Sequence, residues 1–484
     1  MSDSLAINLT ILVPLAGAGL IGITGRWPNL RETLTVVTSV ALFLLVISLL
    51  APVQAGEMPH ATWFTIIPGI DLAFAVEPLG MLFALIASFL WIPTSFYAFG
   101  YMRAHEEQNQ TRFYACFAIA LGSTMGVAFA ANLFTLFIFY EILTLSTFPL
   151  VTHSGTDEAR RAGRTYLGIL LGTSIVLQLL AIIWTWTLSG TVEFIAGGIL
   201  ANHASEGIAA VLLVLYVFGI GKAAVMPFHR WLPAAMVAPT PVSALLHAVA
   251  VVKAGVFTVL KIAVYVFGVD LLQTLSTSRL MMYAAVITLV LASLIALRQN
   301  NLKRLLAYST VSQLSYVVLG AMLATNLGII GGGMHLAMHA FGKITLFFCA
   351  GAILIAAHKK EVSELDGIGR AMPYTMAAFA IGSLSMIGLP PTAGFISKWY
   401  LMSGAIESGA MIALAALIFS TLINAAYFLP IVYAAFFRLP AGPQTHGEAP
   451  PTMVGAILLT AAGTVLLFLF PDQALGLVKG ITGG

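Results

Sequence analysis

The sequence predicts an all-α integral membrane protein, and its composition and apolar runs support this fold class. Of its 484 residues, 60% are hydrophobic and only 8% are charged, whereas a soluble domain carries about 25% charged residues. The apolar residues form runs of about 20, the length of helix that crosses a hydrocarbon core of about 30 Å. No loop between these runs is long enough for a soluble domain. We therefore expect no cofactor, no redox centre and no nucleic-acid partner, and we expect a lipid bilayer around the chain.

Hydropathy predicts about fourteen transmembrane helices. Spans 4 and 5 follow each other closely, and little more than Asn132 separates them. The predicted spans are 5–24, 34–53, 73–101, 113–131, 132–152, 163–188, 207–229, 240–267, 280–298, 303–324, 327–357, 373–400, 408–437 and 452–471.

The distribution of lysine and arginine predicts the orientation of the chain. If the N-terminus lies outside, the inner loops hold 15 basic residues and the outer segments hold only Arg279 and Lys479. Inner loops of membrane proteins carry the excess of basic residues, so we expect a bacterial cytoplasmic (inner) membrane protein with both termini on the outer side. The five basic residues inside spans are all lysines, namely Lys222, Lys253, Lys261, Lys343 and Lys398. Lysine, unlike arginine, can lose its proton where water is excluded.

Residues 222–255, KAAVMPFHRWLPAAMVAPTPVSALLHAVAVVKAG, predict a broken seventh helix with the break at Pro227. Proline breaks a helix, and the freed backbone groups are tolerated in a membrane only where protein or water satisfies them. The same segment contains Lys222, His247 and Lys253. Ionisable groups at membrane depth are candidates for function, and a broken helix beside them is typical of ion carriers.

Spans 4–8 and 9–13 predict two five-helix repeats. Span 12 is broken at Pro390 and Pro391, about 163 residues after Pro227, and span 9 begins about 167 residues after span 4. An odd number of helices in each repeat inverts the second copy across the membrane, as in many transporters. The predicted organisation is a three-helix segment, two inverted repeats and a C-terminal helix, over residues 1–112, 113–267, 280–437 and 452–484.

Five stretches together resemble a known family. They are KAAVMPFHRWLPAAMVAPTPVSALLHA (222–248), FTLFIFYEILTLSTFPLV (134–151), NLKRLLAYSTVSQLSY (301–316), HLAMHAFGKITLFFCAGAI (335–353) and IGLPPTAGFISKWYL (387–401). They resemble the antiporter-like membrane subunits of respiratory complex I, of Mrp-type sodium/proton antiporters and of energy-converting hydrogenases. This resemblance covers most of the chain. It implies fourteen helices, two inverted five-helix repeats and broken helices 7 and 12.

Glu141 and Lys222 are the first candidate proton sites. A buried carboxylate stays charged only beside a positive group, and Glu141 lies in the middle of span 5. The resemblance maps the helix-5 glutamate of the family to Glu141 and the helix-7 lysine to Lys222, and implies that they pair. A change in their separation then changes the proton affinity of Lys222. The structural alternatives are a fixed ion pair and a lysine that extends to the membrane surface.

His247, Lys253 and Lys261 lie in span 8. Histidine titrates near neutral pH, which suits a relay, although a lone helical histidine is often a core residue. Lys253 follows His247 by six residues and therefore lies about 120° around an α-helix from it, so we assign it to a different step or to a neighbouring subunit. Lys261 lies near the outer end, and we expect its side chain to extend to the surface.

His335, His339 and Lys343 recur every fourth residue and share one face of span 11. The His-x-x-x-His spacing also suits a metal, but no carboxylate or thiol completes a site and the lysine repels a cation. We predict a proton wire and no metal. Gly331–Gly333 precede it and predict an irregular or π-type turn. Lys398, after the second break, is the predicted terminal proton site, and a lysine there resembles the Mrp D-type subunit.

These residues predict a proton-translocating subunit. The proton is taken up from inside, binds Lys222, passes His247 and the face of span 11, and leaves through Lys398. The resemblance implies a D-like subunit of a multi-subunit Mrp-type antiporter, which works with other membrane subunits and exchanges protons for Na⁺ or K⁺. A membrane-arm subunit of a complex I-like NADH:quinone oxidoreductase or hydrogenase stays open. The chain has no flavin or iron–sulfur motif, so any redox chemistry belongs to partners. A structural membrane anchor for a soluble enzyme is the alternative of another class.

Overall fold

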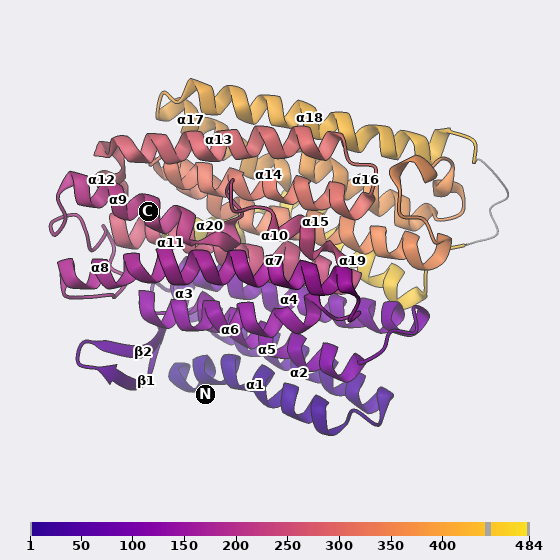
Figure 1. The fold of residues 1–484 in the computed structure, drawn as a ribbon, viewed down its shortest axis with the longest axis horizontal. Helices are drawn as coiled ribbons and strands as arrows, with labels where there is room; N and C mark the ends of the chain where they lie inside the picture. Colours follow the sequence, from indigo (N-terminus) through magenta and orange to yellow (C-terminus); the bar gives the residue numbers. More distant parts are fainter. Residues whose placement is uncertain (1, 441–446, 482–484) are drawn as a thin grey trace.

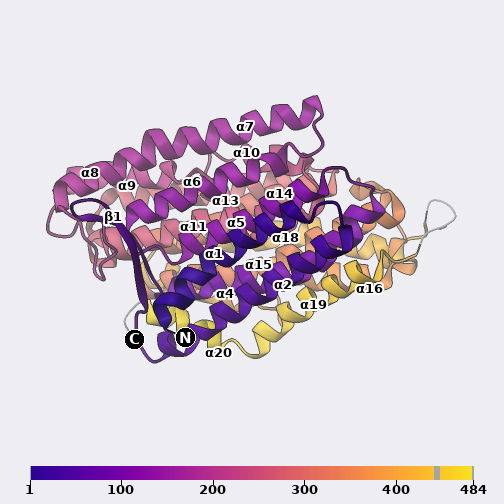
Figure 2. The ribbon, with the colours of Figure 1, turned by 90° about the horizontal axis from the view of Figure 1, so that it is seen from below.

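The computed structural model describes residues 2–440 and 447–481. Most helices run side by side along the longest axis of the molecule (Figure 1). A view turned by 90° shows the same bundle, with both termini toward the end that carries a β-hairpin (Figure 2). We call this the hairpin end and the other the loop end.

The elements follow the predicted order. The N-terminal part contains α1 (Asp3–Ile23), α2 (Pro28–Ser48), α3 (Leu50–Gln54), β1 (His60–Ile67), β2 (Ile70–Ala75) and α4 (Pro78–Ala104). The first repeat contains α5 (Gln110–Ala128), α6 (Leu133–Val151), α7 (Asp157–Thr173), α8 (Leu179–Ser189), α9 (Glu206–Gly219), α10 (Trp231–Ala234) and α11 (Val251–Ile262). The rest contains α12 (Val269–Thr274), α13 (Ser276–Leu297), α14 (Leu302–Met322), α15 (Asn326–Ala357), α16 (Pro373–Ile387), α17 (Gly394–Glu407), α18 (Met411–Phe437), α19 (Pro451–Leu469) and α20 (Asp472–Gly480).

The helical membrane fold is confirmed. Among the described residues, 11 helical segments are long and apolar enough to cross a membrane. The other three predicted spans correspond to α5, to the short α9 and to the interrupted pair α16 and α17, so the exact number fourteen stays a prediction. Large apolar side chains on the outer helices face outward, and Leu44, Leu422 and Phe437 are 61%, 63% and 71% exposed. Such side chains suit a lipid surrounding.

The β-hairpin was not predicted, and span 3 therefore begins at residue 78 rather than 73. β1 and β2 pair antiparallel, and Gly69 in the turn has a φ of +87° that a side chain would disfavour. β2 continues into the first repeat, because Ala75 N donates to Phe129 O at 2.7 Å and Ala131 N donates to Ala73 O at 3.0 Å. An apolar strand raises the hydropathy of its neighbourhood as a helix does, so hydropathy alone does not separate them.

Both predicted helix breaks are present, but the first begins earlier than expected. α9 ends at Gly219, well before Pro227, and Lys222 lies inside the break in one turn of 3₁₀-helix. The prediction that Lys222 precedes the break is wrong, because the α-helix ends where Gly219 packs closely on the backbone of Gln178. The second break separates α16 from α17 and contains Pro390 and Pro391.

Three π-helical segments occur where the sequence predicts regular helix: Ser174–Gln178, Val242–Ala250 and Ala263–Phe267. The second contains His247, so the angle of 120° predicted between His247 and Lys253 is wrong, because a π-helix bonds i to i+5 and turns less per residue.

The irregular turn predicted at Gly331–Gly333 is also wrong, since α15 is an unbroken α-helix. These glycines instead allow close packing. An added Cβ at Gly331, Gly332 or Gly333 would lie 2.7 Å from Leu401, 3.2 Å from Leu260 or 2.8 Å from Val478. Small residues let membrane helices approach closely.

A matched pair of interactions relates the two repeats. Asn132 caps α6, pairs with Glu193 in a β-bridge and donates to its carboxylate at 3.2 Å. Asn301 caps α14 and makes the same bridge and the same 3.2 Å bond with Glu361. Asn132 follows the strand-like residues 129–131 at the hairpin end, whereas Asn301 follows α13, which runs from that end to the loop end. These opposite positions support the inverted relation of the two repeats.

Candidate functional site

Lys222 is fully buried in the first break, and α6 holds its ammonium group. The Lys222 Nζ donates to Tyr140 O at 2.8 Å and to Thr144 Oγ1 at 2.6 Å. It also lies 3.1 Å from the centroid of the Tyr140 ring. Gly255 of α11 faces the backbone of Lys222 so closely that an added Cβ would collide with it. The break therefore fixes one amine against a single turn of α6.

Glu141 does not form the predicted ion pair with Lys222 in the described structure. Both of its carboxylate oxygens are buried without a hydrogen-bond partner, and the lysine bonds instead to Tyr140 and Thr144. Consecutive side chains of a helix point about 100° apart, and Lys222 enters on the Tyr140 side. The predicted contact is therefore wrong, while the control of Lys222 by the charge of Glu141 stays a prediction.

His247 lies close to the first break but makes no direct contact with Lys222. It is fully buried, and neither ring nitrogen has a hydrogen-bond partner. The rings of Trp231 and Tyr166 lie 6.2 and 6.3 Å from its ring centroid. Trp231 Nε1 donates at 3.0 Å to the carbonyl of Gly221, the neighbour of Lys222. An aromatic layer thus lies between the two predicted sites.

Lys253 makes the contact that joins the two repeats. Its Nζ is in hydrogen-bond contact with His339 Nδ1 of α15. The rings of His339 and His335 stack with centroids 5.8 Å apart, as the shared helix face predicts. His335 Nδ1 lies 2.9 Å from Ser397 Oγ of α17, next to Lys398. Within the described ranges, no three His, Cys, Asp or Glu side chains gather closely enough to hold a metal ion.

Lys343 begins a second hydrogen-bonded path toward the break in span 12. Its Nζ donates to Ser309 Oγ at 2.8 Å, and Tyr427 Oη lies 3.0 Å from the same hydroxyl. Tyr427 donates to Asn424 Oδ1 at 2.5 Å, and Asn424 Nδ2 donates to Met386 O at 3.2 Å. Four helices, α14, α15, α16 and α18, supply these groups.

Lys398 receives this path at the second break. Its Nζ donates to Met386 O at 3.0 Å, to Ile387 O at 2.8 Å and to Thr421 Oγ1 at 3.1 Å. The two carbonyls are free because α16 ends there. Gly388 follows with a φ of +88°, and an added Cβ would press on the Lys398 side chain. The break therefore creates the acceptors that hold the lysine.

Buried polar atoms without a protein partner follow the same route. In the described residues they include atoms of Ser243, His247, Gln313, Tyr316, His335, His339, Ser383 and Ser385. Buried polar atoms in folded proteins that lack a protein partner usually bond to water. The polar face of α14 is divided, since Ser309 and Ser312 bond to other side chains whereas Gln313 and the Tyr316 hydroxyl do not.

Sequence reasoning missed two groups. Lys261 does not extend to the surface as predicted, since it is 1% exposed and its Nζ lies 3.3 Å from the carboxylate of Glu77. The available signal was Glu77-Pro78 after an apolar strand, because a capping acid followed by proline starts a helix. Lys303 was predicted only as an inner-loop charge, yet its Nζ donates to Ala238 O in the first break at 2.7 Å.

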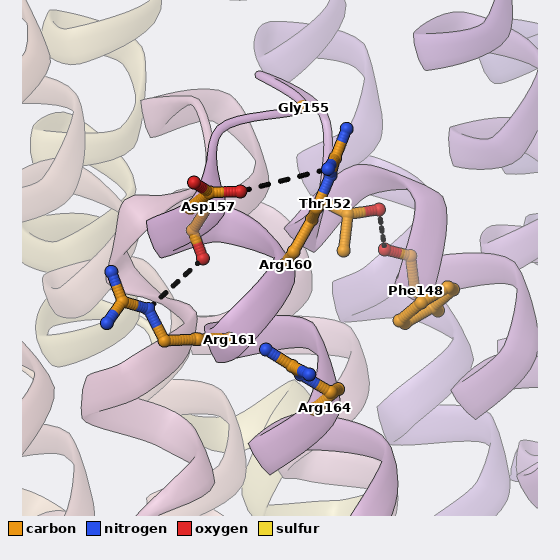
Figure 3. A pocket seen from close by; sticks show the side chains of 7 residues that line it. All are labelled: Phe148, Thr152, Gly155, Asp157, Arg160, Arg161 and Arg164. Carbon is orange, nitrogen blue, oxygen red and sulfur yellow. Dashed lines mark hydrogen bonds and ion pairs between the residues drawn. The ribbon is translucent and has the colours of Figure 1, made fainter.

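A surface cavity of about 820 Å³ opens beside the start of α7 (Figure 3). It is lined by Phe148, Thr152, Gly155, Asp157, Arg160, Arg161 and Arg164. Asp157 lies 3.7 Å from Arg160, and its carbonyl accepts from Arg161 Nε at 3.3 Å. None of the predicted proton sites lines this cavity, which belongs to the basic loop end.

The sequence from residue 130 to 424 matches the family described as NADH:quinone oxidoreductase/Mrp antiporter, transmembrane. NADH-quinone oxidoreductase subunit N of Desulforudis audaxviator is 33% identical over 423 residues, which cover 84% of this chain and 83% of that protein. The chain belongs to this family. The matched region contains all eight predicted proton sites, from Glu141 to Lys398.

Two further comparisons agree with this assignment. A protein of Rhizobium meliloti that is named as a probable K(+)/H(+) antiporter subunit is 29% identical over 485 residues, 97% of this chain and 47% of that protein. A chain in the structure of the Mrp complex from Dietzia sp. DQ12-45-1b has the same fold, with a TM-score of 0.88, 21% identity and coverage of 99% and 97%. This family member is a multi-pass membrane protein, and its relatives are subunits of multi-subunit membrane complexes.

Proposed function

We propose that this chain is a proton-translocating membrane subunit. The observation that supports this most strongly is the row of buried ionisable groups that crosses from one repeat to the other. Lys253 contacts His339, which stacks on His335. Lys343 is linked by side chains and one carbonyl to Lys398. Buried charges are expensive in a membrane, so a row of them indicates an ion path.

The chemistry of the row suits protons. Exclusion of water favours the neutral form of an amine, and a nearby negative charge favours the charged form. Each lysine is therefore able to gain and lose a proton as its surroundings change. Glu141 is adjacent in sequence to Tyr140, which holds Lys222 through its carbonyl and its ring. A proton or charge at Glu141 therefore acts on Lys222 at short range.

The proposed route has two ends. A proton is taken up near the first break, binds Lys222 and passes His247 toward Lys253, with water bridging the groups that lack a protein partner. It leaves through Lys398 at the second break. The basic loop end faces the cytoplasm, and both termini face outward in a bacterial inner membrane, because Lys and Arg collect on the inner side.

The preferred assembly is a multi-subunit Mrp-type cation/proton antiporter in which this chain is D-like. The lysine at position 398 and the likeness to an antiporter subunit over 97% of the chain favour it. The second candidate is a membrane-arm subunit of an NADH:quinone oxidoreductase or a hydrogenase, which the 33% identity to subunit N favours. In that case a partner subunit performs the redox chemistry. A purely structural anchor is the third outcome of the test below.

The test uses membrane vesicles that contain the chain with its partner subunits. Wild type is compared with Lys222→Ala and Lys398→Ala, each at equal amounts of assembled complex. Proton exchange that depends on Na⁺ or K⁺ without an electron donor, and that both variants lose, supports the antiporter. Proton movement only with NADH or hydrogen supports the redox-driven assembly. Full transport by both variants overturns the proton relay and leaves the structural anchor.

A further inference from the structure

We propose that Glu77, Lys261 and Tyr265 form an additional proton site at the hairpin end, between the central relay and the surface. This inference rests on the proposed function and adds a site to it. Neither Glu77 nor Tyr265 belongs to the predicted relay, and Lys261 was expected to lie at the surface. The three side chains come from the start of α4 and from the end of α11 and its π-helical continuation.

The cluster is tightly bonded and almost closed. The Lys261 Nζ lies 3.3 Å from Glu77 Oε1 and donates to Ala130 O at 2.7 Å. Tyr265 Oη donates to Glu77 Oε2 at 2.8 Å. Lys261 is 1%, Glu77 4% and Tyr265 9% exposed. The tyrosine is therefore the member nearest to water, and the lysine is the member nearest to the core.

The cluster is in line with the central relay. Lys253, Phe257 and Lys261 recur every fourth residue of α11 and share one face. Lys253 and Lys261 are eight residues apart, about 12 Å along the helix, and Lys253 contacts His339. The Phe257 ring lies between them, 5.5 Å from the Lys261 Nζ and 5.1 Å from the Phe83 ring. One aromatic layer thus separates Lys261 from the relay.

The hairpin covers the other side of the cluster. Ala130, whose carbonyl accepts from Lys261, pairs with Phe74 of β2 in a bridge. The Phe194 ring lies 4.4 Å from the Lys261 Nζ and 6.2 Å from the Tyr265 ring. A displacement of the hairpin would therefore move an acceptor of the lysine. This position suits a gate between the buried relay and the surface.

The proposed step conserves charge and protons. An N–H bond of the Lys261 ammonium breaks while an O–H bond forms on Glu77, so that the ion pair becomes a neutral amine and a carboxylic acid. The acid then releases its proton to water at the hairpin end through the Tyr265 hydroxyl. The amine regains a proton from the Lys253 side, and the ion pair is restored. Uptake in the reverse direction uses the same steps.

Arginine distinguishes this site from a structural ion pair. Arg at position 261 keeps the charge but does not release a proton, whereas a structural pair tolerates it. Glu77→Gln keeps an oxygen that can cap Leu79 and Gly80, which the carboxylate now caps. Glu193→Gln is the matched control, because Glu193 lies nearby and accepts from Asn132 rather than from Lys261. Burial raises the pKa of Glu193 above its ordinary value.

Proton transport is measured in vesicles that hold the whole complex, with its assembly checked by size-exclusion chromatography. We expect Lys261→Arg and Glu77→Gln to lower transport by about 100-fold, as for the loss of one positioned proton-transfer group, and Glu193→Gln to retain it. Activity of Lys261→Arg together with loss in Lys261→Met would make the pair structural and overturn the inference. Activity of both Lys261→Arg and Glu77→Gln would also overturn it. If Lys222→Ala is inactive in the same preparation, the proposed function survives that failure; if Lys222→Ala is active, the function itself fails.

Discussion

At the residue scale, each buried lysine of the second repeat depends on neutral acceptors rather than on an acid. Lys343 donates to Ser309, and Lys398 donates to carbonyls that the second break leaves free. A neutral acceptor holds a charged amine more weakly than a carboxylate does. The arrangement therefore keeps each lysine ready to lose its proton.

Ser309 gives the first prediction at this scale. Ser309→Ala removes the acceptor of Lys343 and separates it from Tyr427. We expect proton transport to fall by about tenfold, because an unsatisfied buried donor costs about 1–3 kcal/mol and 1.4 kcal/mol corresponds to tenfold. Ser312→Ala is the control, since Ser312 bonds to Ser293 on the neighbouring helix. Equal loss in both variants would show a packing effect of α14 instead.

At the element scale, the interruptions of helices position the chemistry. The first break admits Lys222 to the surface of α6, and the second provides the acceptors for Lys398. The sequence predicts both breaks because proline and the dipeptide Pro390-Pro391 cannot continue a helix. It does not predict where α9 ends, since that depends on Gly219 packing on another helix.

The matched caps of the two repeats give a prediction at this scale. Asn132→Ala and Asn301→Ala each remove a side-chain cap and the partner of a glutamate. We expect each to lower the free energy of unfolding by about 1 kcal/mol or more, measured with a denaturing detergent. Ser205→Ala is the control, because Ser205 starts α9 without a capping bond. A change in only one of the two asparagine variants would contradict their equivalence.

At the scale of the whole molecule, the two inverted repeats contribute to one polar path. The apolar pattern and the spacing of four along α15 are enough to predict the spans and the shared face of His335 and His339. The contact of Lys253 with His339 and the turn of Lys222 away from Glu141 depend on how helices pack. The hairpin and the Glu77–Lys261 pair were missed because they depend on a strand that resembles helix in hydropathy.

The orientation of the molecule gives a further prediction. In a variant without Cys116, a single cysteine is placed at the hairpin end by His60→Cys or at the loop end by Arg160→Cys. The native Cys349 is buried. Because the loop end carries most of the basic residues, we expect a membrane-impermeant maleimide to label the first variant in intact cells and the second only after lysis. The opposite labelling pattern would reverse the proposed orientation.

The most direct test of the central claim is proton transport by His339→Ala in vesicles that contain the assembled complex. His339 is the residue through which Lys253 of the first repeat contacts the second repeat. Our account predicts that transport is lost while the amount of complex is unchanged, and that His60→Ala, an exposed histidine of β1, retains the wild-type rate. Wild-type transport by His339→Ala would contradict a single path through both repeats.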